Sequence, residues 1–208
     1  MNSLLQHERD LWAKGSKFVA GVDETGRGAL AGPLLAAAVI LPESFDATGI
    51  KDSKDMSEAQ RAAVYPRILA EAVAVSVAWV SARVIDGATE AGRFDACHKD
   101  LLRRAVEGLY PEPDFVLIDH YVPDLRFENK AISHGEKVSA SIAGAAIVAK
   151  VTRDRMMIDL DRFFPRWGFA RHKGYGGGGG EHEAALALHR ASPIHRRSSA
   201  GVRRALRE

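Results

Sequence analysis

The sequence has a single cysteine, Cys97, among its 208 residues, so no disulfide bond can form within the chain. A chain of this length buries roughly 70% of the surface that its unfolded form exposes, which is enough for a hydrophobic core without cross-links. Any metal site is therefore expected to serve chemistry rather than stability. A chain without disulfides also suits a reducing compartment, and we expect the protein to be cytoplasmic.

Long hydrophobic runs are also missing. The longest, residues 29–41, is interrupted by Gly32 and Pro33 and is shorter than the roughly 20 residues that span a bilayer. Residues 1–17 carry charges and lack the apolar centre of a signal peptide. We therefore expect a soluble protein that has no membrane partner and is a monomer.

Two common kinds of catalytic site find no support in the sequence. The histidines and the single cysteine do not occur at the spacings of zinc ligands. A Ser/His/Asp pattern for nucleophilic catalysis is absent as well. Hydrolysis by either route is therefore not indicated.

The formal net charge is only +2, but the charges are segregated along the chain. Ten of the 29 Lys and Arg residues, and only three of the 27 Asp and Glu residues, lie in residues 162–208. A basic segment beside an acidic body is typical of a metal-using enzyme that acts on a polyphosphate. On charge alone, an ordinary solvated basic tail fits equally well.

The apolar pattern alternates strands with helices. Strands are expected at residues 18–22, 34–41, 73–79 and 115–119, the first two as a hairpin and the third with one buried face. Helices are expected to begin at capping boxes at Ser3 and Ser57 and to cover residues 89–108, 139–164 and 181–190.

This order predicts an α/β domain with a mixed sheet flanked by helices and a small helical C-terminal appendage. We expect residues 1–165 to form the catalytic core. Residues 166–208 are expected to form a basic substrate-binding segment that packs on the same domain.

Acidic residues end two of the predicted strands. Asp23 and Glu24 close the first strand, directly before a glycine-rich turn, and Asp119 ends a later strand that should lie beside it. A carboxylate at the end of a buried strand is unfavourable unless it is paired or binds a cation. Several such carboxylates would suit Mg²⁺ or Mn²⁺. From spacing alone, a turn cap at Asp119 and ion pairs with Arg27 explain the same residues equally well.

Several motifs resemble those of a known family. Residues 21–33 (GVDETGRGALAGP) closely resemble the opening motif of the ribonuclease HII family. Further segments agree with that family in order and spacing: DSK at 52–54, VLID at 116–119, a long helix ending AKVTRD at 149–154, HKGYG at 172–176 and HRRS at 195–198. The resemblance covers about residues 18–207, and several motifs in register are far more specific than one.

The resemblance implies a ribonuclease H-like fold and an endonuclease that hydrolyses the RNA strand of RNA/DNA hybrids. It extends this activity to single ribonucleotides embedded in duplex DNA. It also implies Mn²⁺ or Mg²⁺ as cofactor, two ions in the mechanism, and products with 5′-phosphate and 3′-hydroxyl ends. Ribonucleotide removal from DNA and primer clearance are both compatible with it, and recruitment by a sliding clamp is left open.

The resemblance also implies the catalytic carboxylates, namely Asp23, Glu24 and Asp119 as metal ligands. The fourth ligand of the family is usually an aspartate after a glycine. Here Gly135 precedes Glu136, so Glu136 is the expected fourth catalytic ligand and Asp154 is the fallback.

Substrate contacts are implied in the same way. The glycine turn would approach the ribose 2′-hydroxyl, and Tyr175 would pack on the sugar at the RNA-to-DNA junction. Arg196 and Arg197 would contact phosphates or brace the fold. The full set of expected substrate-binding residues is Gly26, Arg27, Gly28, Ser53, Lys54, His172, Lys173, Tyr175, Arg196 and Arg197.

Two departures from the family pattern keep other functions open. Glu136 is one methylene longer than aspartate, and the run Gly176–Gly180 replaces a segment where a threonine is expected near Gly177. Five glycines raise the entropic cost of ordering the loop of Tyr175, which predicts weaker substrate positioning. The alternatives are a catalytically weakened hybrid-binding protein of the same fold and a related DNA junction nuclease, although Tyr175 argues against the latter.

Overall fold

The computed structural model describes residues 3–176 and 180–206 of the chain. The elements in chain order are η1 (Ser3–Leu5), α1 (Gln6–Trp12), β1 (Val19–Thr25), β2 (Leu34–Ile40), α2 (Glu58–Glu71), β3 (Ala74–Val80), α3 (Ala82–Glu90), α4 (Phe94–Glu107), β4 (Phe115–Asp119), β5 (Glu128–Ile132), η2 (Gly135–Lys137), α5 (Ala140–Phe163), η3 (Pro165–Trp167), α6 (Phe169–His172), α7 (Glu181–His189) and α8 (Ala200–Ala205).

The chain forms two compact units, each built from three separate segments. The first unit comprises residues 1–25, 36–78 and 98–151, and the second comprises residues 26–35, 79–97 and 152–208. The long helix α5 contributes its N-terminal half to the first unit and its C-terminal half to the second. The expected division at residue 165 stays a prediction.

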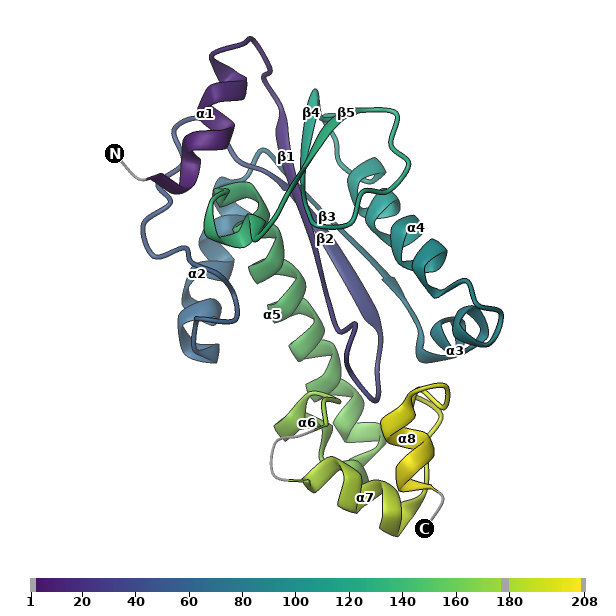
Figure 1. The fold of residues 1–208 in the computed structure, drawn as a ribbon. Coiled ribbons are helices and arrows are strands. Elements are labelled where there is room, and N and C mark those ends of the chain that lie inside the picture. The colour runs from purple at the N-terminus through teal and green to yellow at the C-terminus, as the bar shows by residue number, and fades with distance from the viewer. Residues whose placement is uncertain (1–2, 177–179, 207–208) are drawn as a thin grey trace. The chain divides into compact units, whose positions relative to one another are not determined.

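A five-stranded sheet with the strand order β3-β2-β1-β4-β5 lies largely in the first unit (Figure 1). Strand β4 pairs in parallel with both β1 and β5. Strand β2 neighbours β1, and the residues 26–33 between them are too few for a crossover, so this pair runs antiparallel. The sheet is therefore mixed, as the sequence predicts.

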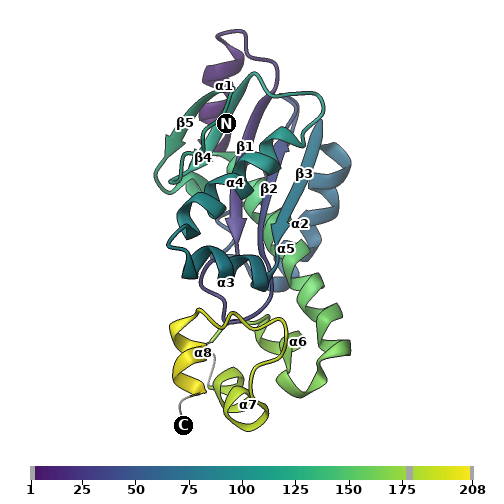
Figure 2. The same ribbon diagram turned by 90° about the vertical axis from the view of Figure 1, so that its right-hand side faces the viewer.

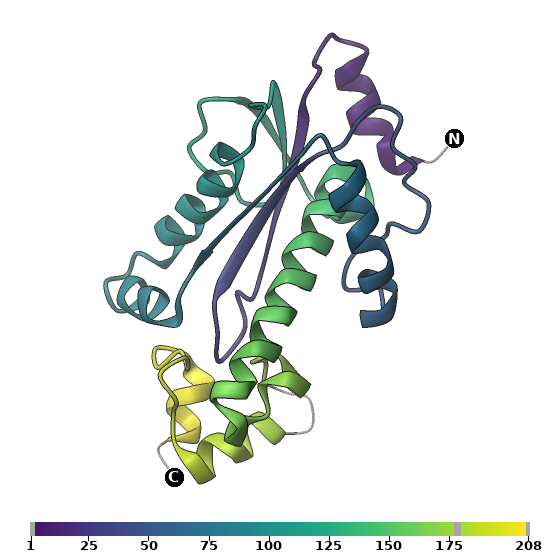
Figure 3. The ribbon, with the colours of Figure 1, turned by 180° about the vertical axis from the view of Figure 1, so that it is seen from behind.

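Helices cover both faces of the sheet in the first unit. Helix α4 lies on one face (Figure 2), and α2 and the N-terminal half of α5 lie on the other (Figure 3). Gly21 of β1 lets α5 approach the strand closely, because a Cβ at this position would lie 2.1 Å from the carbonyl carbon of Ser141. The α/β fold class is thus confirmed, with helices on both sides of a mixed sheet.

A buried carboxylate anchors the start of α5. Glu8 of α1 is fully buried, and its Oε1 accepts hydrogen bonds from Ser139 Oγ at 2.6 Å and from the amide of Ser141 at 2.9 Å. An anion at a helix N-terminus is favourable because the unpaired amides and the helix dipole point toward it. The amide of Ser139 also donates to the carbonyl of Gly135, so this contact steadies the turn η2.

The second unit is built around two small apolar clusters. Ala31, Met157 and Phe169 form one cluster, and Leu30, Leu186 and Val202 form the other. These clusters pack the turn after β1 against the C-terminal helices. The sequence predicts only some of these helices. Helix α7 follows the expected bounds, whereas α6 and α8 were not expected.

Two local predictions need correction. Helix α1 begins after Leu5 without a side-chain cap, so the capping box at Ser3 is wrong, whereas the one at Ser57 is confirmed by both of its hydrogen bonds. The single helix expected over residues 89–108 is two helices, α3 and α4, which are separated near Gly92 with a φ of +66°. In β3 the small residues face inward, and Val77 and Trp79 are 40% and 51% exposed. Among the described helices, none is both long and apolar enough to cross a membrane.

Candidate metal centre and substrate-contact residues

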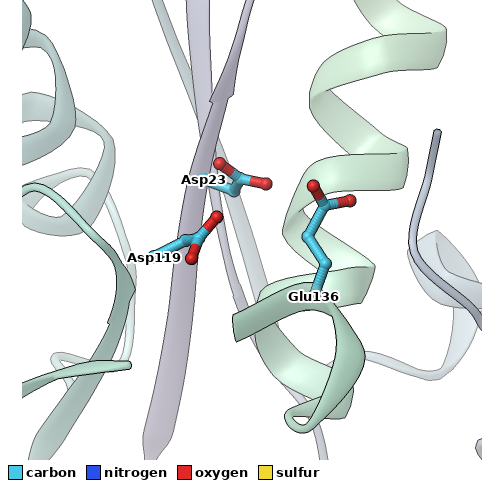
Figure 4. A group of neighbouring side chains, drawn as sticks. All are labelled: Asp23, Asp119 and Glu136. Carbon is cyan, nitrogen blue, oxygen red and sulfur yellow. The ribbon is translucent and has the colours of Figure 1, made fainter. Parts of the chain in front are cut away.

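Three carboxylates converge at one edge of the sheet in the first unit (Figure 4). Asp23 comes from β1, Asp119 from the end of β4, and Glu136 from the turn η2. One oxygen of each residue lies within 4.8 Å of one oxygen of the other two. Because β1 and β4 are parallel neighbours, their C-terminal ends carry Asp23 and Asp119 to the same edge.

Asp119 also fixes the turn that carries Glu136. Its Oδ1 accepts a hydrogen bond of 2.9 Å from the amide of Gly135. A Cβ on Gly135 would lie 2.6 Å from Cδ1 of Ile142 in α5, so a larger residue here would force the Ile142 side chain to move. The glycine before Glu136 therefore has a local structural reason, and it brings the glutamate to the two aspartates.

Glu136 is buried and is held by the segment that follows β2. Its Oε2 accepts a hydrogen bond from the amide of Ser53, and its Oε1 accepts one from Nζ of Lys54, each at 2.8 Å. The hydrogen bond to Glu136 raises the pKa of Lys54, which keeps the ammonium charged. The family resemblance assigned Ser53 and Lys54 to substrate phosphates. In the structure both contact Glu136, and the phosphate contacts stay a prediction.

The charges of this site favour a bound cation. Asp23 is almost fully buried, and burial, followed by the charges of Glu24 and Glu136, raises its pKa well above the ordinary value. Clustered anions that oppose ionisation in this way are stabilised by a divalent ion. Carboxylate oxygens are hard ligands, which Mg²⁺ and Mn²⁺ prefer. The residues present therefore fit such an ion.

Two carboxylates named from the sequence lie outside this group. Glu24 follows Asp23 in the strand and points to the other face, where its Oε1 lies 3.3 Å from Nε2 of the fully buried His98 in α4. Asp154 is buried in the part of α5 that belongs to the second unit. His98 was not singled out by the sequence analysis.

In the second unit, the buried side chain of Arg196 holds the glycine turn through hydrogen bonds to its backbone. Its Nη1 donates to the carbonyls of Gly26 and Arg27 at 2.6 and 3.2 Å, and its Nε donates to the carbonyl of Gly32 at 3.0 Å. Burial, with a smaller effect of Arg153, lowers the pKa of Arg196 to about 9, so the side chain stays cationic at neutral pH. This geometry favours the bracing alternative for Arg196.

Other residues of the second unit that were expected to contact substrate lie at its surface. Arg27, Gly28 and Arg197 are exposed. The amide of Arg197 donates to Oδ2 of Asp86, which leaves its guanidinium at the surface. Nη2 of Arg27 lies 3.6 Å from Oδ1 of Asp95.

Tyr175 lies shortly after α6, whose last residue is His172 and whose C-cap is Lys173. The guanidinium of the fully buried Arg153 lies 4.9 Å from the centre of the Tyr175 ring. Nζ of Lys173 donates to the carbonyl of Ala170 at 2.6 Å, and His172 contacts backbone atoms. The threonine expected near Gly177 concerns a position outside the described residues.

Asp23→Asn is expected to stabilise the metal-free protein more at pH 9 than at pH 5. A raised carboxyl pKa favours folding below the ordinary aspartate pKa, and this stabilisation is lost as the pH rises through the folded-state value. Asparagine cannot ionise, so the variant escapes this loss. Thermal unfolding in chelator would measure it, since 1 kcal/mol shifts the Tm of a domain this size by about 2–4 °C.

The matched control for this experiment is Asp124→Asn, which changes an exposed aspartate after β4. Its Tm should follow the wild type at both pH values. Added Mg²⁺ or Mn²⁺ should raise the Tm of the wild type more than that of Asp23→Asn. A Tm difference between Asp23→Asn and the wild type that does not change with pH would contradict the role of Asp23 ionisation.

Comparison with known proteins agrees with these motifs. Residues 20–200 match the family model described as Ribonuclease HII. A ribonuclease HII of Desulfitobacterium hafniense is 44% identical over 207 residues, which cover 99% of this chain and 77% of that protein.

Solved structures share the fold. The ribonuclease H2 of Pyrococcus horikoshii OT3 has a TM-score of 0.77 at 24% identity, covering 90% of this chain and 96% of that one. The RNase HII in a PCNA complex from Archaeoglobus fulgidus has a TM-score of 0.67 at 24% identity, covering 86% and 93%. Bst-RNase HIII in complex with Mn²⁺ has a TM-score of 0.72 at 21% identity, covering 93% and 70%.

Proposed function

Because the chain belongs to the ribonuclease HII family, and is therefore an endoribonuclease that acts on RNA/DNA hybrids, we propose that it also cleaves at single ribonucleotides embedded in duplex DNA. We propose that Asp23, Asp119 and Glu136 serve this hydrolysis as ligands of two divalent ions. The observation that carries the proposal is the convergence of these three carboxylates within 4.8 Å.

The protein residues would hold the ions and the substrate in place. When bound, two Mg²⁺ or Mn²⁺ ions would supply an activated water and stabilise the leaving 3′ oxygen, which gives 5′-phosphate and 3′-hydroxyl ends. Lys54 and the amide of Ser53 orient Glu136 by a hydrogen bond to each of its carboxylate oxygens. Glu24 is proposed as a further ligand on the family resemblance, and Asp154 is the alternative to Glu136.

Selection of RNA over DNA requires a contact to the 2′-hydroxyl, because this group differs at every sugar. The backbone of Gly26, Arg27 and Gly28 is proposed to make that contact, and the bonds from Arg196 hold this turn in shape. The ring of Tyr175 is proposed to pack on the sugar at the RNA-to-DNA junction. The exposed Arg197 is proposed to contact a substrate phosphate. Lys54 is proposed to contact one as well, while it keeps its hydrogen bond to Glu136.

Further proposals concern the metal ion, the protein partner, the oligomeric state and the location of the enzyme. Mn²⁺ and Mg²⁺ are both proposed as the ion, and the Mn²⁺ complex of Bst-RNase HIII supports the former. The PCNA complex of the Archaeoglobus protein supports a sliding clamp as a partner. A monomer in the cytoplasm is proposed from the sequence alone.

The test uses duplexes of one sequence that contain no ribonucleotide, one ribonucleotide, or a full RNA strand paired with DNA. We expect metal-dependent cleavage on the 5′ side of the single ribonucleotide, with a ligatable 5′-phosphate, and no cleavage of all-DNA duplex. Cleavage of the full hybrid alone would overturn the part that concerns embedded ribonucleotides. Binding without cleavage would indicate a weakened hybrid-binding protein, and cleavage of a DNA junction would indicate a junction nuclease.

A further inference from the structure

Three histidines of the second unit contact one another beside Tyr175. The rings of His172 and His182 are stacked with centroids 4.2 Å apart, and the rings of His182 and His195 are 5.1 Å apart. His182 and His195 are almost fully buried, at 1% and 2% exposure. The proposed function uses neither His182 nor His195, so their burial next to the substrate-contact segment needs an explanation.

The hydrogen bonds of this cluster fix which nitrogen carries each proton. The amide of Ser192 donates to Nδ1 of His195 at 2.9 Å, and the Ser192 hydroxyl lies 2.7 Å from the same nitrogen, so Nδ1 is the acceptor of the neutral ring and Nε2 carries the proton. Nε2–H of His195 then donates to Nε2 of His182 at 3.0 Å. His182 must in turn carry its proton on Nδ1, which donates to the carbonyl oxygen of Tyr175 at 3.2 Å.

His172 holds the same stretch of backbone from its other side. The amide of Gly174 donates to Nδ1 of His172 at 3.1 Å, and Nε2–H of His172 donates to the carbonyl of Trp167 at 2.7 Å. The carbonyl of Gly174 accepts hydrogen bonds from the amides of Leu30 and Ala31. The backbone around Tyr175 is therefore held by two imidazoles, His172 at the amide of Gly174 and His182 at the carbonyl of Tyr175.

Two observations support the view that a hydrogen-bonded chain of neutral histidines restrains the backbone at Tyr175. Burial lowers the pKa of His182 to about 4 and that of His195 to about 3, so both rings are neutral near pH 7. Tyr175 is followed in the sequence by the run Gly176–Gly180, and glycine has no conformational preference that could restrain the backbone by itself.

We propose that His195 and His182 are positioning residues, which act through a hydrogen-bonded chain to fix the backbone of Tyr175 so that its ring can meet the substrate sugar. This proposal rests on the proposed function, in which Tyr175 contacts substrate. The chain runs from Ser192 through both rings to the carbonyl of Tyr175. It would compensate for the glycines that follow this tyrosine.

A matched pair of variants tests the chain. Asparagine at position 182 places its amide near the site of Nδ1 and can still donate to Tyr175, whereas glutamine reaches the site of Nε2 and keeps only the bond to His195. We expect His182→Gln to raise the KM for a duplex with one ribonucleotide about tenfold with little change in kcat. His182→Asn should raise it much less. Equal KM values for the two variants would overturn the proposal.

A double-mutant cycle separates this proposal from the proposed function. If His182 acts through Tyr175, His182→Gln should not raise KM further in a Tyr175→Ala background. An equal increase in both backgrounds would overturn the positioning role while leaving the function intact. If Tyr175→Ala by itself leaves KM unchanged, the substrate contact of Tyr175 fails, and the positioning role fails with it.

A spectroscopic measurement on the wild-type protein does not depend on activity or on variants that fold. Long-range ¹H–¹⁵N correlation should show the proton of His182 on Nδ1 and those of His172 and His195 on Nε2. His182 should stay neutral on titration to pH 5, with His172, Glu183 and Arg197 as its titratable and charged neighbours. A proton on Nε2 of His182, or a pKa near the ordinary histidine value, would overturn the chain.

Discussion

Asp119→Asn is expected to lower the rate of cleavage at an embedded ribonucleotide by at least about 1000-fold and to leave the protein folded. Asparagine keeps an oxygen that can accept the hydrogen bond from Gly135, so the turn that carries Glu136 should survive. It removes the negative charge that a divalent ion requires. Metal ions supply several kcal/mol of transition-state stabilisation, and each 1.36 kcal/mol corresponds to a factor of about ten in rate.

The measurement is a single-turnover cleavage assay at saturating enzyme, with Mg²⁺ and with Mn²⁺, beside thermal unfolding of the same samples. Asp124→Asn is the control, because it removes an exposed aspartate five residues further along the chain. It should retain the wild-type rate. If Asp119→Asn remains within tenfold of the wild type while Asp124→Asn is unchanged, Asp119 is not a ligand of the catalytic ions.

The position of the aspartates at the ends of strands could be predicted because strand ends are visible in a sequence. Asp23 and Asp119 each end an apolar run, and parallel neighbours bring such ends to one edge. The direction of Glu24 was harder to foresee. Adjacent strand residues alternate between faces, and β1 continues through Thr25, beyond Glu24.

The place of Glu136 followed from family resemblance and not from periodicity. It depends on contacts between distant segments, namely the amide of Gly135 with Asp119 and the amide of Ser53 with Glu136. A single sequence does not display such pairings. For the same reason, Ser53 and Lys54 were expected at phosphates, although their nearest partner in the structure is a carboxylate.

For the fold as well, the hydrophobic pattern of the sequence predicts some features and leaves others open. Continuous apolar runs predicted β2 and β4, because strands buried on both faces have little choice of environment. The period of two in β3 predicted a strand but not which of its faces is covered. Ala74, Ala78 and Val80 are buried on the covered face, and Val77 and Trp79 lie on the exposed one.

The buried polar residues are the part of the structure that the sequence pattern predicted least. Arg153 lies four residues from both Ala149 and Met157, which are buried residues of the same helix, so its position on the buried face was visible in the spacing. A charged residue at such a position is rare and normally needs several partners. The sequence does not reveal that these partners are backbone carbonyls.

Arg153→Met is expected to lower the stability of the protein by roughly 3 kcal/mol, which is about 6–12 °C in Tm. The guanidinium donates to the carbonyls of Pro33 and Lys173 at 2.9 Å and to the carbonyl of Ala31 at 3.0 Å. Hydrogen bonds from a charged donor contribute about 1.5–3 kcal/mol each. The cost of burying the cation, which also lowers the pKa of Arg153, offsets part of this sum.

Arg153→Lys distinguishes the geometry of the guanidinium from its charge. Lysine carries the same charge, but its single ammonium cannot reach three carbonyls that surround a planar fork, so it should be nearly as destabilising as methionine. Arg162→Met is the control, because Arg162 lies exposed in the same helix and its ion pair with Asp159 contributes little. Thermal unfolding of the three variants decides the matter. If Arg153→Lys unfolds at the wild-type temperature, the charge alone suffices, and the three carbonyls do not need the arginine.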